Sequence, residues 1–112
     1  MIHQLNLHPA PFKAIKKEKK TIEMRLNDEK KSLIQIGDFI VFTNRENNEQ
    51  IKCKVINIFH YRNFEELYKN HSKTLLGYEE NEIANPDDML IYYSKDRIEK
   101  YGVLGIEIKL IK

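Results

Sequence analysis

The stretch KKTIEMRLND, residues 19–28, decides how the rest of the chain is interpreted, because it sets charged side chains into the pattern of a strand. Apolar side chains recur at every second position, at Ile22, Met24 and Leu26. The positions between and beside them are polar: Thr21, Glu23, Arg25 and Asn27. Successive side chains of a strand point to opposite faces, so we expect the apolar set to face a core and the polar set to share the other face.

That polar face is the candidate functional site. Residues two apart on a strand are separated by roughly 6.6 Å, so Glu23 and Arg25 can contact one small ligand or one phosphodiester. A carboxylate beside a guanidinium offers a hydrogen-bond acceptor next to a planar fork of donors. Lys20 stands where the preceding turn meets the strand, so its side chain need not follow the alternation. An ordinary solvated strand face has the same spacing, and composition does not separate the two interpretations.

The charge balance limits how the chain can bind nucleic acid. Its 112 residues are 41% hydrophobic, which suits one core and predicts a single domain over residues 1–112. A net charge of +2 argues against binding through bulk charge. The basic residues of the first third are nevertheless concentrated: Lys13, Lys16, Lys17, Lys19, Lys20, Arg25, Lys30 and Lys31. We expect either a local patch that neutralises a few phosphates or a solvated helix face.

Metal, cofactor and membrane chemistry are not expected. The lone Cys53 allows no disulfide framework and no thiolate metal site, although Lys52 and Lys54 would lower its pKa if it were exposed. The four histidines lack metal-ligand spacing, so we expect no metal and no cofactor. No stretch approaches the roughly 18 apolar residues of a membrane span, and the chain does not begin like a signal peptide. A cytoplasmic protein without a membrane partner is predicted, and nothing in the sequence indicates an oligomeric state.

The order of predicted elements indicates an α+β fold. Strands are expected over residues 2–7, 20–25, 39–43, 50–59 and 103–111, with the third and fourth forming an antiparallel hairpin. Helices are expected over 11–17, 63–70 and 85–93, and residues 94–100 extend the last of these or form a third helix capped by Ser94. Five or six mostly antiparallel strands of this kind can roll into a small, partly open β-barrel flanked by short helices. Side chains fill such a barrel, so a ligand is expected in a cleft between barrel and helices.

Several fragments together resemble the ASCH domain (activating signal cointegrator homology) of the PUA-like superfamily, in its small, stand-alone bacterial or archaeal type. They are Lys20-x-x-Glu23-x-Arg25 after a short basic helix, Gly37-Asp38 before an apolar strand, and Tyr101-Gly102-Val103 at the last strand. The resemblance runs from about Pro11 to the C-terminus. It implies a PUA-like barrel that binds RNA or a modified nucleoside or nucleotide in a cleft between barrel and helix. The implied ligand-binding positions are Lys20, Thr21, Glu23 and Arg25, with Asn27 beside them.

The resemblance also implies an alternative, a small hydrolase. One branch of small ASCH proteins removes the acetyl group from N4-acetylcytidine with a Lys, a Thr three residues later and a downstream Glu. Lys20 fits the first position, but position 23 is Glu, and Thr21 lies two residues from the expected place. The downstream acid could be any of Glu79, Glu80, Glu82, Asp87 and Asp88. Other ASCH proteins resemble ribonucleases, in which Lys20 and Glu23 would act as acid and base and Arg25 as a phosphate clamp.

Tyrosines offer one further feature with two interpretations. Their aromatic faces can stack on bases of any sequence, or they can fill the core and its rim. The candidates are Tyr61, Tyr78, Tyr92 and Tyr93.

Overall fold

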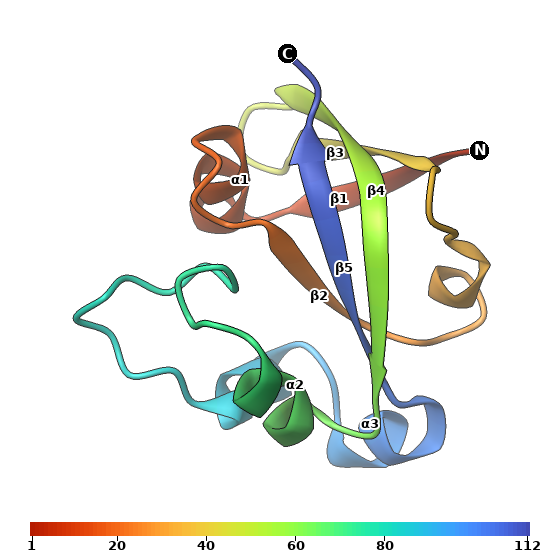
Figure 1. Cartoon of the computed structure of the whole chain (residues 1–112), viewed down its shortest axis with the longest axis vertical. Helices are drawn as coiled ribbons and strands as arrows, with labels where there is room; N and C mark the ends of the chain where they lie inside the picture. The colour runs from red at the N-terminus through yellow and green to blue at the C-terminus, as the bar shows by residue number, and fades with distance from the viewer.

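The fold is a five-stranded mixed sheet that curls strongly into a half-barrel, with short helices around it (Figure 1). The computed structural model describes residues 1–112. Its strands are β1 (Ile2–Leu7), β2 (Ile22–Leu26), β3 (Phe39–Asn44), β4 (Gln50–Tyr61) and β5 (Val103–Leu110). Their order in the sheet is β1-β3-β4-β5-β2, in which only the β1–β3 pair is parallel. The predicted α+β class and the partly open, mostly antiparallel barrel are thereby confirmed.

The helices are short, and three of them begin at a capping Asn or Ser. They are α1 (Pro9–Lys16), η1 (Lys31–Leu33), α2 (Phe64–Asn70), η2 (Pro86–Ile91) and α3 (Lys95–Tyr101). Side chains of Asn63, Asn85 and Ser94 accept hydrogen bonds from the first turns of α2, η2 and α3. The predicted helix over 85–93 is instead the 3₁₀ helix η2. The Asn85 side chain binds the amide only two residues ahead, which favours a tight turn.

Two hydrophobic clusters lie on opposite faces of the sheet. The barrel core gathers apolar residues of β3, β4 and β5 under α1, which contributes Phe12 and Ile15. The helical core packs Ile22, Met24 and Leu26 of β2 against α2, η2 and α3. The apolar set of β2 therefore faces a core, as its alternation predicts. None of the helices has the length and hydrophobicity needed to cross a bilayer.

The opposite face of β2 is buried as well, which the sequence does not predict. Glu23 lies opposite Ile106 of β5, and Arg25 lies opposite Leu104. Directly opposite residues of an antiparallel pair share a face, and Ile106 and Leu104 belong to the barrel core. Of the two interpretations of this face, a solvated surface does not describe Glu23, which is 3% exposed because the curled sheet encloses it.

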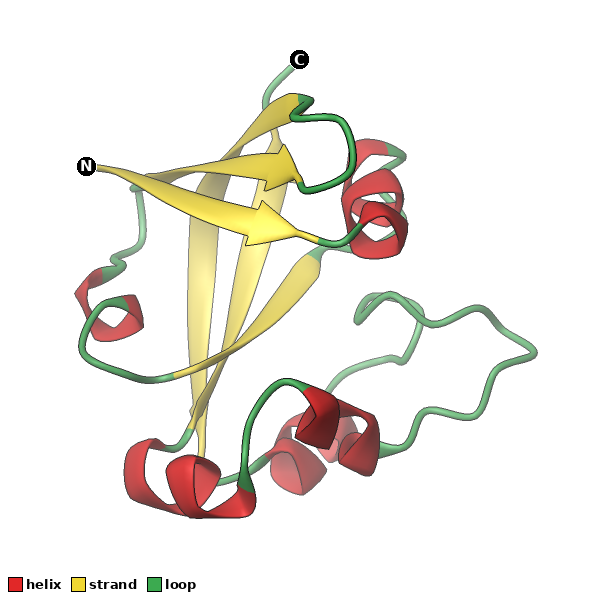
Figure 2. Cartoon of the chain, turned by 180° about the vertical axis from the view of Figure 1, so that it is seen from behind, coloured by secondary structure: helices red, strands yellow, loops and turns green.

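The two edge strands β1 and β2 do not pair, and the gap between them is the seam of the half-barrel (Figure 2). One side chain crosses it: Nη2 of Arg25, on β2, donates a hydrogen bond of 2.9 Å to the Asn6 carbonyl of β1. An open edge of this kind presents unpaired backbone groups, and here a guanidinium satisfies one of them. Arg25 thus links β1 and β2 across the seam, where the backbones of the two strands do not pair.

Cys53 is fully buried in the barrel core, between exposed lysines that point to the other face of β4. Burial raises the pKa of the Cys53 thiol to about 11, with a smaller contribution from the charge of Glu23. The lowering expected for an exposed thiol beside two lysines therefore does not occur. Glu23 lies on the same side of the sheet as Cys53, because it stands opposite Ile106, which belongs with Cys53 to the barrel core.

A pH-dependent contact joins β1 to the start of β3. The side chain of Asp38 binds His3 Nε2 at 2.8 Å and accepts from the Gln35 amide at 3.0 Å. These hydrogen bonds lower the pKa of Asp38 from its ordinary 3.8 to about 2. Because the pKa is depressed on folding, the stabilisation is complete above about pH 4 and is lost as the pH falls through 2.

We therefore expect Asp38→Asn to be less stable than the parent chain at pH 5 and the difference to shrink between pH 4 and pH 2. Urea unfolding followed by circular dichroism at several pH values measures it. A difference that stays constant from pH 5 to pH 2 would show that the Asp38 carboxylate contributes nothing through its charge.

Candidate functional site

The candidate site is built around one carboxylate held between two cations. Lys20 Nζ lies 3.0 Å from Glu23 Oε1, and Arg25 Nε lies 2.8 Å from Glu23 Oε2. The side chains of Lys20, Glu23 and Arg25 are only 8%, 4% and 16% exposed. We call this arrangement the Lys20–Glu23–Arg25 triad. Buried charges are costly unless paired, and here each carboxylate oxygen has its own cation.

The local chain path explains how Lys20 joins the triad. After α1, Glu18 adopts a left-handed conformation with φ 60°, and the Lys20 amide donates to the Ala14 carbonyl. Lys20 is therefore still part of the turn, and its side chain does not follow the alternation of β2. Strict alternation would have directed it to the helical core with Ile22, so the turn is what brings its ammonium to Glu23.

A backbone segment covers Lys20 from the other side. The Leu75 carbonyl accepts from the amides of Thr21 and Ile22 at 3.0 and 3.1 Å. At Gly77, which has φ +109°, an added Cβ would lie 3.1 Å from Lys20 Cδ. Only glycine adopts this backbone conformation readily and leaves room for the lysine. The sequence predicts an irregular path for this region but not its contact with Lys20.

The electrostatics keep Glu23 and Arg25 ionised. Burial alone would raise the pKa of Glu23, but the charges and hydrogen bonds of Lys20 and Arg25 outweigh it and hold this pKa below its ordinary value. Burial would lower the pKa of Arg25, and the Glu23 carboxylate instead raises it. Burial raises the pKa of Tyr93, whose phenol lies near enough to feel both charges. A carboxylate held in this way is a weak base at neutral pH.

The predicted site residues do not line one shared hollow. Arg25 lines a hollow of about 490 Å³ that runs along the seam and is bordered by β1 and η1. Lys20 and Thr21 line a separate hollow of about 80 Å³ beside α1 and β5. Glu23 lines neither and lies buried between them. The Asn27 amide donates a hydrogen bond to the Gly102 carbonyl. The buried Oδ1 of Asn27 accepts no hydrogen bond.

The downstream carboxylates do not join the triad. Glu79, Glu80 and Glu82 are exposed on the loop after α2. Asp88 accepts from the Tyr78 hydroxyl at 2.8 Å, and Asp87 lies in the first turn of η2. None of the five forms a hydrogen bond or ion pair with Lys20 or Glu23. No group of three or more His, Cys, Asp or Glu side chains is arranged to hold a metal ion.

The tyrosines divide between packing and surface. Tyr61, Tyr78 and Tyr93 are partly buried against the helical core. Tyr92 is 49% exposed, and its ring centroid lies 5.8 Å from that of His8, at the start of α1. Only Tyr92 therefore combines substantial exposure with a neighbouring aromatic ring.

Sequence reasoning missed two residues that complete the site. Asn6 supplies the carbonyl that orients Arg25, and Arg45 lines the same hollow from the end of β3. A backbone carbonyl carries no sequence signal. Arg45 stands in the polar loop after residue 44, where nothing distinguishes it from an ordinary surface residue.

Comparison with known proteins gives a consistent result. The family model of the ASCH domain matches residues 5–112. The chain is similar to the crystal structure of hypothetical protein PH0355, with 31% identity, a TM-score of 0.84, and coverage of 99% of this chain and 100% of that one. It is similar to protein PF0455 from Pyrococcus furiosus, with 30% identity, a TM-score of 0.72, and coverage of 100% and 99%. A mutant of ZmASCH from Zymomonas mobilis shares the fold, with 14% identity, a TM-score of 0.60, and coverage of 96% and 67%. No curated protein matches the chain.

Removing the central charge of the triad is expected to destabilise the fold strongly. Glu23→Gln keeps the volume but leaves Lys20 and Arg25 as buried cations without a counter-charge. Breaking a buried pair from one side costs about 3–5 kcal/mol. Urea unfolding at pH 7 measures the loss in the free energy of unfolding.

Glu49→Gln is the matched control, because it removes an exposed partner of Lys16 and is expected to cost under about 1 kcal/mol. Equal losses for the two variants would show that burial does not strengthen the triad.

Proposed function

Because the chain belongs to the ASCH domain family, we propose that it binds RNA or a modified nucleoside or nucleotide at the face formed by Lys20, Thr21, Glu23, Arg25 and Asn27. Direct contact with the ligand is assigned to Arg25, because this residue lines the larger hollow along the seam, which we call the seam hollow. Glu23 and Lys20 act as positioning residues, since their charged groups pair with each other inside the barrel.

The orientation of Arg25 is the observation that carries this proposal. Its Nε donates to Glu23 and its Nη2 donates to the Asn6 carbonyl, so two contacts fix the plane of the guanidinium. Nη1 donates to no protein atom, which leaves two N–H groups of this terminal nitrogen free. A guanidinium held in one plane loses little entropy on binding, and its geometry suits a phosphate or a base carbonyl.

Asn27 supports the same proposal from the end of β2. Its Oδ1 is buried and accepts no hydrogen bond. A buried acceptor without a partner costs about 1–3 kcal/mol, so such an atom in a folded protein calls for an explanation. On the present proposal, a ligand N–H or a water that the ligand orders donates to this atom after the side chains that cover it move, because Asn27 lines neither hollow.

The same geometry gives the hydrolase alternative no support, and we do not propose it. Glu23 has a lowered pKa and both of its oxygens are paired, whereas a general base near neutral pH needs a raised one. None of the five downstream carboxylates contacts Lys20 or Glu23. Thr21 shares only a small hollow with Lys20.

Arg25→Lys tests the proposal, because it keeps the positive charge beside Glu23 but removes the planar fork. We expect its affinity for a pool of 12-nucleotide single-stranded RNA, or for cytidine and N4-acetylcytidine, to fall by about 5- to 150-fold, equivalent to about 1–3 kcal/mol. Isothermal titration calorimetry measures binding, and circular dichroism checks the fold.

Arg62→Lys is the control, because Arg62 is 82% exposed at the far end of β4 and lines neither hollow. It is expected to bind as the parent chain does. Unchanged affinity of Arg25→Lys, or a parent chain that retains none of these ligands, would refute the proposal. Acetate released from N4-acetylcytidine in a Glu23-dependent way would favour the hydrolase instead.

A further inference from the structure

The seam hollow is more basic than the chain as a whole. Besides Arg25, its wall contains Lys30, Lys31 and Arg45, and it contains no Asp or Glu. None of these three additional cations forms an ion pair. In a chain with a net charge of only +2, this is a local concentration of uncompensated positive charge.

Three acidic residues near this wall make hydrogen bonds of their own. Asp28 Oδ1 accepts from the Lys31 amide at 3.0 Å, and Glu29 accepts from the Tyr101 hydroxyl at 3.3 Å. Asp38 binds His3 and the Gln35 amide. Asp38 thereby pairs with the N-terminus and with His3 in the same wall, and none of the three carboxylates forms an ion pair with Lys30, Lys31 or Arg45.

The edge of β1 adds polar backbone groups to the same hollow. The Met1 carbonyl accepts from the Phe39 amide of β3, and the Leu7 carbonyl accepts from the Arg45 amide just after it, so the odd-numbered residues of β1 direct their backbone groups to that strand. The even-numbered residues therefore direct their backbone groups to the seam, as the bond from Arg25 to Asn6 confirms. Exposed apolar side chains of Met1, Ile2 and Leu33 complete the wall.

We propose that the seam hollow binds the phosphate groups of a single-stranded nucleic acid, so that the ligand of this protein is a polynucleotide strand and not a free nucleoside. The inference rests on the proposed function, since Arg25 belongs to both. A neutral nucleoside has no charge to pair with three unpaired cations, whereas a polynucleotide carries one negative charge at each successive phosphate. The volume of about 490 Å³ lies within the roughly 300–1,000 Å³ range of ligand pockets, which suits one inserted strand.

An acidic peptide added along the open edge of β1 is the competing occupant. Such a peptide would use the backbone groups of β1, whereas phosphates mainly use the side-chain cations. The cation-rich wall favours phosphates, because a peptide strand would bring its own backbone partners and would require fewer charges. Comparing how the same variants bind RNA and polyglutamate separates the two possible occupants, a nucleic acid strand and an acidic peptide.

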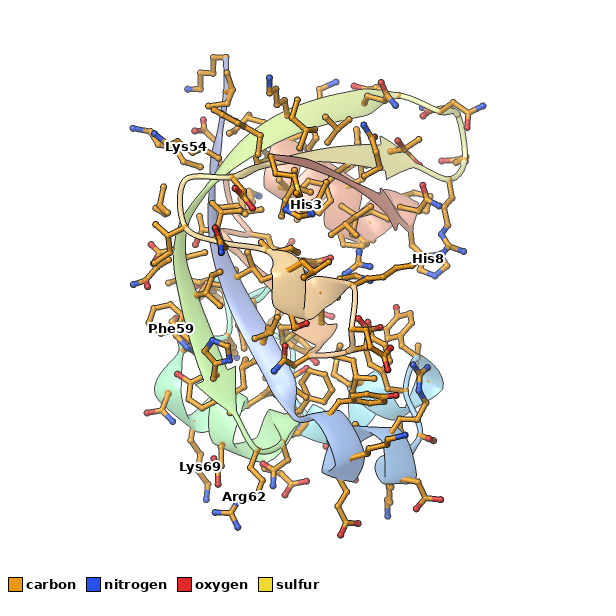
Figure 3. All side chains as sticks on the ribbon, turned by 90° about the vertical axis from the view of Figure 1, so that its right-hand side faces the viewer. His3, His8, Lys54, Phe59, Arg62 and Lys69 are labelled. Carbon is orange, nitrogen blue, oxygen red and sulfur yellow. The ribbon has the colours of Figure 1, made fainter.

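The test uses a charge-neutralised variant, called the seam variant, which combines Lys30→Gln, Lys31→Gln and Arg45→Gln. The control variant, Arg62→Gln with Lys69→Gln and Lys95→Gln, makes the same change in net charge at exposed positions that line neither hollow. Figure 3 shows the separation: Arg62 and Lys69 lie at one end of the molecule, far from His3 in the wall of the hollow. The unfolding transitions of both variants verify folding.

Binding of a 12-nucleotide single-stranded RNA is measured between 50 and 200 mM NaCl by fluorescence anisotropy. For single strands, each lost phosphate contact reduces the magnitude of the slope of log K against log[salt] by about 0.7. The seam variant removes three cations, so we expect the magnitude of its slope to be smaller by about 2. The control variant is expected to keep the slope of the parent chain. Binding of cytidine or N4-acetylcytidine, where the parent chain shows it, is expected to be unchanged in both variants.

Other outcomes would overturn the inference. A seam variant with the slope of the control, an equal loss of nucleoside binding, or tighter binding of polyglutamate than of RNA would each contradict it. A parent chain that binds nucleosides but not the RNA strand would contradict it while leaving the proposed function intact. Loss of RNA binding in the seam variant with none in Arg25→Lys would instead refute the proposed function and support the phosphate site.

Discussion

The ion pairing of Glu23 with Lys20 and Arg25 inside the barrel is the constraint on which the rest of the structure depends. A carboxylate on this face of β2 would be too costly in an apolar core, so the chain must bring a cation to each oxygen. The turn after α1 supplies one, and Arg25, the next residue on the same face of β2, supplies the other. The loop at Gly77 then covers Lys20, which seals one side of the triad from solvent.

The same pairing shapes the open side of the barrel. Held by Glu23, the Arg25 guanidinium reaches across the seam to Asn6 and joins two strands that do not pair. Arg25 thereby pairs with a buried charge and stabilises an edge strand. Its Nη1 donates to no protein atom, and the residue lines a hollow together with other cations. The stability of the fold and the proposed binding of an anionic ligand consequently depend on the same guanidinium.

Local sequence signals predicted much of this fold. The alternation of Ile22, Met24 and Leu26 located β2 and its face toward the helical core, and Asn63 and Ser94 located two helix starts. Other features depend on contacts distant in sequence. Alternation cannot reveal that the sheet curls over Glu23, because that depends on strands added far along the chain. The parallel pairing of β1 and the position of Arg45 beside Arg25 depend on the same long-range arrangement.

The most direct test of this account is the titration of the Glu23 side-chain carboxyl, followed by ¹³C NMR from pH 7 downward while the protein stays folded. The account requires that its two cationic neighbours outweigh burial, so the pKa is expected below the ordinary 4.5. Titration at or above 4.5 would mean that burial dominates. The triad would then not be held by charge, and the central claim would be wrong.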